Sequence, residues 1–357
     1  MTAIDILSLR LRNQHISLSG FDRPEQVASW FGGMQAQDYS AVIWAIGLRC
    51  SGATAQSVEG AIGSKAIIRT WLMRGTIQAA AASDVGWMLE LLAPRLISQS
   101  QRRLNELELD KAALSRSFKS IEGALLGGNC LSRSEILSRL EQAGVSAKGA
   151  RGYHILRQAG LRALICFGPN QDKQQTFRLL DEAASRGPSL TREEALTELA
   201  ARYFGSHGPA AMQDFIWWSG LTAADARAGV ESITAQLAEE VQGSQSYWFN
   251  ESSRWDGEPA AAVYLLPAYD EYYLGYSDRD IVLDAKYDRR AVSSSGIFRP
   301  MIVIEGKISG TWTKKLKKNH AAISLAPFES LTETKNKALL AAAEEYGNFL
   351  GLPVEVY

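Results

Sequence analysis

The chain has 357 residues, of which 46% are hydrophobic and 22% are charged, and its formal net charge is −1. This length is too great for one simple core and predicts two to four small units of a globular protein. No uninterrupted apolar run approaches the roughly 20 residues that a membrane span needs, so we expect no membrane partner. The balanced charge does not by itself indicate a nucleic-acid-binding protein, although it can hide a basic face.

Cysteine usage and the first residues bear on the compartment. Cys50, Cys130 and Cys166 are odd in number and far apart, which fits no zinc pattern and argues against a disulfide framework. The chain starts without a basic segment followed by an apolar one, so no secretory signal is recognised. We therefore expect a cytoplasmic protein without a metal site. We also expect no cofactor, and a monomer is the default expectation.

The first hundred residues predict several helices followed by two strands. Apolar spacing indicates a helix over residues 4–15. A second helix is expected to start at Asp22 as N-cap with Pro24 in its first turn, and to end at Gly32-Gly33. Further helices are predicted over 39–48 and 54–62, and two short strands over 67–80. Helices followed by a β-hairpin are the order of a winged helix.

A similar order recurs twice along the chain. Ser132 and Glu135 form a capping box that opens a helix, a second helix runs through residues 153–161, and two strands flank a polar loop between 168 and 176. Three more helices are predicted to open at residues 190–194, at Gly208-Pro209 and at residues 221–225. The spacing of these segments is irregular, which indicates tandem duplication rather than a solenoid.

The character of the sequence changes after about residue 245, where strand-like segments dominate. Glu305-Gly306-Lys307 predicts a turn between two of these strands. A helix over 332–350 and a last strand at 354–356 are expected to complete the module. The fold class is therefore predicted to be mainly α with β (α+β), and the predicted segments are 1–100, 101–187, 188–245 and 246–357.

A short polar island, Gln35-Ala36-Gln37, lies between Gly32-Gly33 and Tyr39. Neutral amides have donors and an acceptor but no charge, so a functional pair would position other groups rather than transfer protons. The alternative is a local amide cap or a surface pair, which spacing alone favours. The placement just past a helix end would let both side chains project into a cavity.

Four stretches together resemble the AlkZ-like (AlkZ/YcaQ) family of bacterial winged-helix DNA glycosylases. They span nearly the whole chain in the expected order, and each is weak alone. The stretches are Met34–Gln37, Arg69–Thr76, Arg202–Pro209 with Asp214–Leu221, and Leu265–Tyr276 with Phe298-Arg299-Pro300.

The resemblance implies three tandem winged helices that form a concave DNA-binding surface, plus a C-terminal β-rich, barrel-like module. It implies removal of alkylated bases from double-stranded DNA, in some members with unhooking of interstrand crosslinks, and a nucleoid-associated location. Gln35 and Gln37 match the family's catalytic pair in its two-glutamine version. The chain has Gln78 where family members often have histidine, which puts the rate, the substrate or catalysis itself in doubt.

The chemistry of an alkylated base explains why two amides could suffice. An N7-alkylguanine ring is already cationic and leaves without further protonation, so the protein need only hold a water near C1′ and stabilise an oxocarbenium-like sugar. This describes a monofunctional DNA glycosylase. Asp38 could assist the water, although capping the next helix is the favoured reading.

Residues that face DNA are expected to include basic and aromatic side chains. Arg69 and Arg74 flank Trp71 on the predicted hairpin, although a core position for Trp71 is favoured. Asp270 and Glu271 could pair with Arg279 or Arg299. Their motif is expected to hold the module interface, and bordering the active site is the alternative. His207 is expected to be structural, and Trp217 and Trp218 to divide between core and interface. The other DNA-binding candidates are Gln78, Lys314, Lys315, Lys317 and Lys318, and the four lysines could also form only a solvated turn.

Two other function classes remain open from the sequence. A non-catalytic winged-helix DNA-binding protein or transcriptional regulator is supported by the repeated helix-turn-helix pattern and by Gln78. A protein-interaction scaffold without DNA binding is supported by the near-zero net charge.

Overall fold

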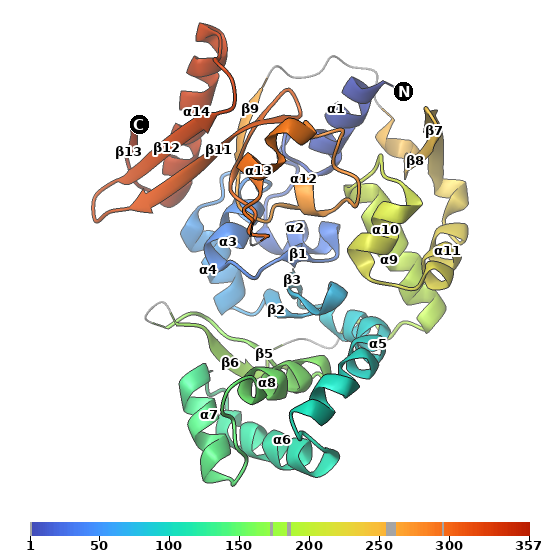
Figure 1. Ribbon diagram of the computed structural model, residues 1–357, viewed down its shortest axis with the longest axis vertical. Coiled ribbons are helices and arrows are strands. Elements are labelled where there is room, and N and C mark those ends of the chain that lie inside the picture. The colour runs from blue at the N-terminus through green and yellow to red at the C-terminus, as the bar shows by residue number, and fades with distance from the viewer. Residues whose placement is uncertain (1, 172–173, 184–186, 255–261, 295) are drawn as a thin grey trace. The chain divides into compact units, whose positions relative to one another are not determined.

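The computed structural model describes residues 2–171, 174–183, 187–254, 262–294 and 296–357 (Figure 1). Two compact units form: a first unit of Met1–Val58 with Leu196–Tyr357, and a second unit of Glu59–Ala195. Both contain helices and antiparallel strands, so the predicted α+β class is confirmed. None of the described helices is long and apolar enough to cross a membrane.

The N-terminal part of the first unit contains α1 (Ala3–Asn13), α2 (Pro24–Phe31), the two-residue strand β1 (Met34–Gln35) and α3 (Tyr39–Gly47).

The predicted N-cap of α2 at Asp22 is wrong by one residue. Arg23 occupies the cap position with extended φ and ψ of −133° and 135°. A residue before proline avoids the helical region, so Arg23 stays extended and Pro24 starts the helix. The helix ends at Gly32, whose φ of 68° is left-handed.

The second unit is built on an antiparallel sheet. Its described strands lie in the order β3-β2-β5-β6-β4. The two predicted hairpins, over 67–80 and around the 168–176 loop, are confirmed. The strands are β2 (Ile67–Trp71), β3 (Ile77–Ala81), β4 (Leu131–Ser132), β5 (Ile165–Phe167) and β6 (Thr176–Leu179), and the helices are α4 (Ala55–Gly63, shared with the first unit), α5 (Val85–Glu106), α6 (Lys111–Leu125), α7 (Arg133–Gln142) and α8 (Arg151–Leu161).

Capping in the second unit follows the sequence closely. The hydroxyl of Ser132 accepts from the N–H of Glu135, and the Glu135 carboxylate accepts from the N–H of Ser132, as the capping box predicts. Thr54 likewise accepts from the N–H of Ser57 at the start of α4. These local bonds explain why the sequence alone predicts these two helix starts.

The rest of the first unit begins with α9 (Arg192–Ser206, which starts in the second unit), α10 (Met212–Ser219) and α11 (Ala223–Glu231), followed by the hairpin of β7 (Leu237–Gln242) and β8 (Gln245–Asn250). The predicted helix start at Gly208-Pro209 is wrong, because α10 begins at Met212. Ala210 exchanges two backbone hydrogen bonds with Trp248, which keeps this stretch extended.

The C-terminal strands form an open five-stranded sheet in the order β13-β12-β11-β10-β9, with β9 and β13 as its described edges. It corresponds to a half-barrel rather than a closed one. Glu305 and Gly306 have φ of 52° and 80° at the predicted turn, as a type I′ hairpin requires. The elements are β9 (Val263–Leu266), α12 (Glu271–Leu274), α13 (Asp288–Ala291), β10 (Met301–Ile304), β11 (Lys307–Leu316), β12 (Ala321–Pro327), α14 (Glu333–Leu350) and β13 (Val354–Val356).

Aromatic packing joins this sheet to α3 and α14. The ring of Tyr346 lies 5.0 Å from that of Trp44 and 5.1 Å from that of Trp312. Each tryptophan donates its indole N–H to a carbonyl of β9, Trp44 to Leu265 and Trp312 to Leu266. The core of the first unit therefore combines segments from both ends of the chain.

The four predicted segments remain a prediction. The boundary expected at residue 100 lies inside α5, and the one expected at residue 245 lies at the start of β8 in the β7–β8 hairpin. A contiguous division of the chain therefore cuts through two elements that the fold keeps whole.

Candidate active site

The segment that carries the two glutamines runs between two helices of the first unit. Met34 and Ala36 are buried, with 1% and 0% exposure, whereas Gln35 is half-buried and Gln37 is exposed. Only Met34 and Gln35 lie in the short strand β1, and Gln37 lies in a bend, so burial rather than strand alternation distinguishes the apolar residues from the amides. This arrangement fits a pair that presents its amides to a substrate.

Asp38 is a helix cap, the reading favoured from the sequence. Its carboxylate accepts from the N–H of Ala41 at 3.0 Å and from the hydroxyl of Ser40 at 2.9 Å. These bonds begin α3 directly after the glutamine pair. The segment is therefore bounded by the left-handed Gly32 on one side and by a capped helix on the other.

A buried carboxylate holds the backbone of the first glutamine. The N–H of Gln35 donates to Oε1 of Glu271 at 2.8 Å, and Glu271 is only 3% exposed. Oε2 of the same carboxylate accepts from the indole N–H of Trp218 at 3.1 Å and lies 3.4 Å from Nε2 of His207. Three elements distant in sequence thus meet at Glu271, the first residue of α12.

His207 is locked in the core around this carboxylate. Its Nδ1 lies 2.8 Å from the Ser206 hydroxyl, and its ring stacks on that of Tyr203 at 4.6 Å. Burial lowers the pKa of His207, with the hydrogen bond and charge of Glu271 opposing that effect. The neutral form is therefore favoured in the folded protein. The structural role expected for His207 fits these contacts.

Arg49, and neither of the two arginines suggested from the sequence, is the described ion-pair partner of Asp270. Asp270 binds Arg49 through two hydrogen bonds of 2.8 and 2.9 Å, and both side chains are buried. The Arg279 guanidinium instead lies over the rings of Tyr273 and Phe298. The suggestion for Asp270 was wrong because Arg49 is 221 residues away and no local pattern marks it as the partner.

Three of the predicted DNA-facing residues in the second unit are buried. Arg69, Trp71 and Gln78 have exposures of 0%, 3% and 1%. The Trp71 ring packs 4.9 Å from that of Phe167, and Arg69 lies over the same Phe167 ring at 5.2 Å. This is the core position favoured for Trp71. Arg74 is half-buried and has a left-handed φ of 55°, which is a strained conformation for a non-glycine residue.

The lysine run lies at the end of the β11–β12 hairpin. Lys315, Lys317 and Lys318 are exposed, as is Leu316 between them. Lys314 differs, because it is half-buried with its ammonium 5.1 Å from the centre of the Tyr346 ring. Burial lowers the pKa of Lys314, and the Asp38 carboxylate acts in the opposite direction. Lys314 is therefore a packed residue against Tyr346 of α14.

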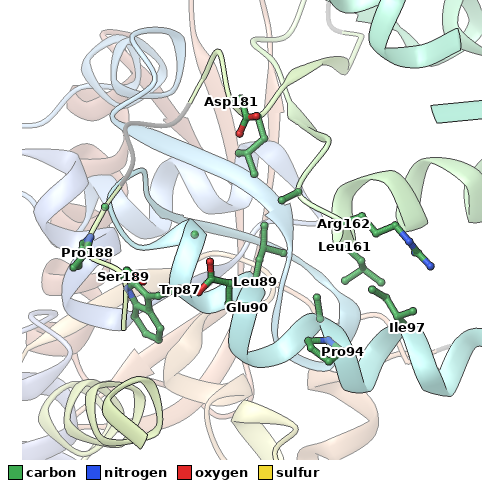
Figure 2. A pocket seen from close by; sticks show the side chains of 15 residues that line it. Trp87, Leu89, Glu90, Pro94, Ile97, Leu161, Arg162, Asp181, Pro188 and Ser189 are labelled. Carbon is green, nitrogen blue, oxygen red and sulfur yellow. The ribbon is translucent and has the colours of Figure 1, made fainter. Parts of the chain in front are cut away.

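A separate cavity of about 590 Å³ lies in the second unit (Figure 2). Its lining is mostly apolar and comes from α5, from the end of α8 with the two residues after it, from Leu180 and Asp181, and from residues 187–189. Trp87, Glu90, Pro94 and Ile97 line it from α5, Arg162 lies near Ile97, and Asp181 comes from a separate segment. No predicted site residue lines this cavity. The described part of the chain has no cluster of histidine, cysteine or acidic residues that could hold a metal ion.

Comparisons with known proteins identify the family of this chain. The family described as "DNA glycosylase AlkZ-like" matches residues 28–349. An interstrand DNA cross-link repair glycosylase from Streptomyces sahachiroi is 25% identical over 331 residues, which cover 86% of each chain. The solved structure of Streptomyces sahachiroi DNA glycosylase AlkZ superposes with a TM-score of 0.82 at 21% identity, over all of both chains, and so shares the fold. The chain belongs to the AlkZ-like family of DNA glycosylases.

Proposed function

We propose that this protein is a monofunctional DNA glycosylase that excises cationic N-alkylpurine bases from double-stranded DNA. The observation that carries the proposal is the segment Met34–Gln37, in which Met34 and Ala36 are buried while Gln35 is half-buried and Gln37 is exposed. We extend the proposal to interstrand crosslinks, because the relative from Streptomyces sahachiroi is named a cross-link repair glycosylase.

In the proposed reaction the amide oxygens of Gln35 and Gln37 accept hydrogen bonds from one water and hold it against C1′. The water oxygen bonds to C1′ while the bond from C1′ to the purine nitrogen breaks. The electron pair of that bond neutralises the cationic ring, and one water proton is released to solvent. A neutral amide is a poor base, so an unmodified purine, which leaves as an anion unless it is protonated, is a poor substrate.

Affinity for DNA is assigned to exposed cations of the same unit. Lys315, Lys317 and Lys318 are exposed at the end of the β11–β12 hairpin. Lysine contacts with phosphate give affinity and position rather than sequence preference. Three tandem winged helices that form a concave DNA-binding surface, a monomeric state and a cytoplasmic, nucleoid-associated location are parts of the same proposal.

A base-release assay tests the reaction. A duplex with one N7-methylguanine is incubated with the protein, and abasic sites are then converted to strand breaks. We expect breaks with the wild-type protein and a loss of about 100-fold or more for Gln35→Ala and Gln37→Ala, with unchanged affinity for the duplex, because misplaced reactants cost about this much. Gln245→Ala, which removes an exposed glutamine from β8, is the matched control.

Two outcomes would contradict the proposal. Sequence-specific binding by folded protein without base release would support a DNA-binding regulator instead. A covalent protein–DNA adduct trapped by borohydride would exclude a monofunctional reaction, and Lys314→Met would then show whether Lys314 supplies the amine.

A further inference from the structure

The carboxylate of Glu271 binds the backbone of the glutamine pair from inside the core. Burying a carboxylate carries a large desolvation cost unless donors surround it. Here the donors are the N–H of Gln35 at 2.8 Å and the indole N–H of Trp218 at 3.1 Å, with Nε2 of His207 at 3.4 Å. The bond to Gln35 therefore belongs to a built, dry cluster.

The surroundings keep this carboxylate from moving. A Cβ on Gly275 would lie 2.3 Å from Cδ2 of His207, so the histidine ring has no room to shift in that direction. On the other side, Asp270 begins α12 by accepting from the N–H of Tyr272, and Arg49 holds Asp270 in turn. Asp270 and Tyr272, the residues on either side of Glu271, are therefore joined by a hydrogen bond, and Arg49 fixes Asp270.

We propose that Glu271 is a positioning residue: by binding the backbone N–H of Gln35 it holds the Gln35–Gln37 segment where the two amides can orient a water against the sugar. This inference rests on the function proposed above. Burial of Met34 and Ala36 anchors the segment in the core through side chains, and the bond from Glu271 adds a restraint on its backbone. A charge-assisted hydrogen bond to the backbone supplies that restraint.

The test compares Glu271→Gln with Asp214→Asn. Asp214 is an equally buried carboxylate of the same unit, and it accepts from the backbone N–H groups of Ala211 and Ser277, which lie outside the glutamine segment. In single-turnover base release from N7-methylguanine duplex, we expect Glu271→Gln to lose 10- to 100-fold in rate with an unchanged dissociation constant for the duplex. Asp214→Asn should stay within about threefold in rate even where its melting temperature falls.

A second readout follows the backbone itself. Hydrogen–deuterium exchange of the peptide that contains Gln35 should be at least tenfold faster in Glu271→Gln than in the wild-type protein, and unchanged in Asp214→Asn. If Glu271→Gln does not fold, Trp218→Phe removes one donor from the carboxylate, and we expect a rate loss of about 3- to 10-fold with faster exchange at Gln35. Unchanged rate and exchange in the folded variant would overturn the proposal.

The two proposals fail in different ways. If the wild-type protein releases no base, the proposed function fails, and the exchange measurement still reports whether Glu271 holds Gln35. If Gln35→Ala abolishes base release while Glu271→Gln is fully active, the function stands and the positioning role is wrong.

Discussion

Arg49 and Asp270 form a buried ion pair with two parallel hydrogen bonds of 2.8 and 2.9 Å, and their side chains are 0% and 2% exposed. Arg49 also donates to the carbonyls of Gln14 and Ala45. The pair joins the end of α3 to the start of α12, the helix that begins with Glu271. A change at Arg49 should therefore affect both stability and the candidate active site.

We expect Arg49→Met to lower the free energy of unfolding by about 3–5 kcal/mol, because it leaves the Asp270 carboxylate buried without its counter-charge. Denaturant unfolding measures this loss. The double variant Arg49→Met/Asp270→Asn should lose less than the single one. Arg102→Met, which removes an exposed partner of Glu106, should change stability by less than about 1 kcal/mol. Equal losses for the two single variants would contradict this account.

Gly160 and Gly123 offer a matched pair of helical glycines in the second unit. A Cβ on Gly160 would lie 2.3 Å from Cε3 of Trp71, whereas one on Gly123 meets nothing within 4 Å. We expect Gly160→Ala to cost about 1–3 kcal/mol through overpacking of the core around Trp71. Gly123→Ala should stabilise by about 0.4–1 kcal/mol, because alanine loses less backbone entropy in a helix. Thermal unfolding of both variants measures these changes in stability. An unchanged stability of Gly160→Ala would mean that Trp71 is free to move.

The three exposed lysines of the β11–β12 hairpin should contribute to DNA affinity by binding phosphate. In the triple variant Lys315→Ala/Lys317→Ala/Lys318→Ala, the slope of log affinity against log salt concentration should fall by about 0.9 for each phosphate that is no longer neutralised. Fluorescence anisotropy with an undamaged duplex at several salt concentrations measures the slope. Lys337→Ala on α14, where the lysine pairs with Glu333, is the control and should leave the slope unchanged. An unchanged slope in the triple variant would show that the three lysines are only exposed to solvent and do not bind phosphate.

Burial of His207 should make the protein less stable in mild acid. Because its pKa is lowered in the folded state, the unfolded chain binds the proton more readily below the ordinary pKa of about 6.5. This contribution to stability is fully present above about pH 6.5 and is lost as the pH falls toward the folded-state pKa. The loss is at most about 1.4 kcal/mol per pH unit. Denaturant unfolding at pH 7.5 and 5.5 should show a smaller drop for His207→Gln than for the wild-type protein, and equal drops would contradict the assignment.

Local elements of this chain were largely readable from the sequence. A helix lies within one residue of the predicted range 332–350, Ser132 with Glu135 opens α7, and Glu305-Gly306 turns between β10 and β11, as predicted. These features depend on residues within three or four positions of each other, so side-chain chemistry alone determines them. The misplaced starts of α2 and α10 occurred where a proline or a distant strand residue governs the backbone.

The sequence by itself determined the fold class and singled out Gln35 and Gln37 as a candidate pair, because two amides in an apolar stretch are visible without coordinates. Only the tertiary structure decided what holds that pair. Glu271 reaches Gln35 across 236 residues, and Arg49 reaches Asp270 across 221. The tertiary structure also placed Arg69, Trp71 and Gln78 in the interior. A short strand with both polar and apolar residues can present either face to the core, and a buried charge can take any partner that folding brings near. Both choices depend on the path of the whole chain.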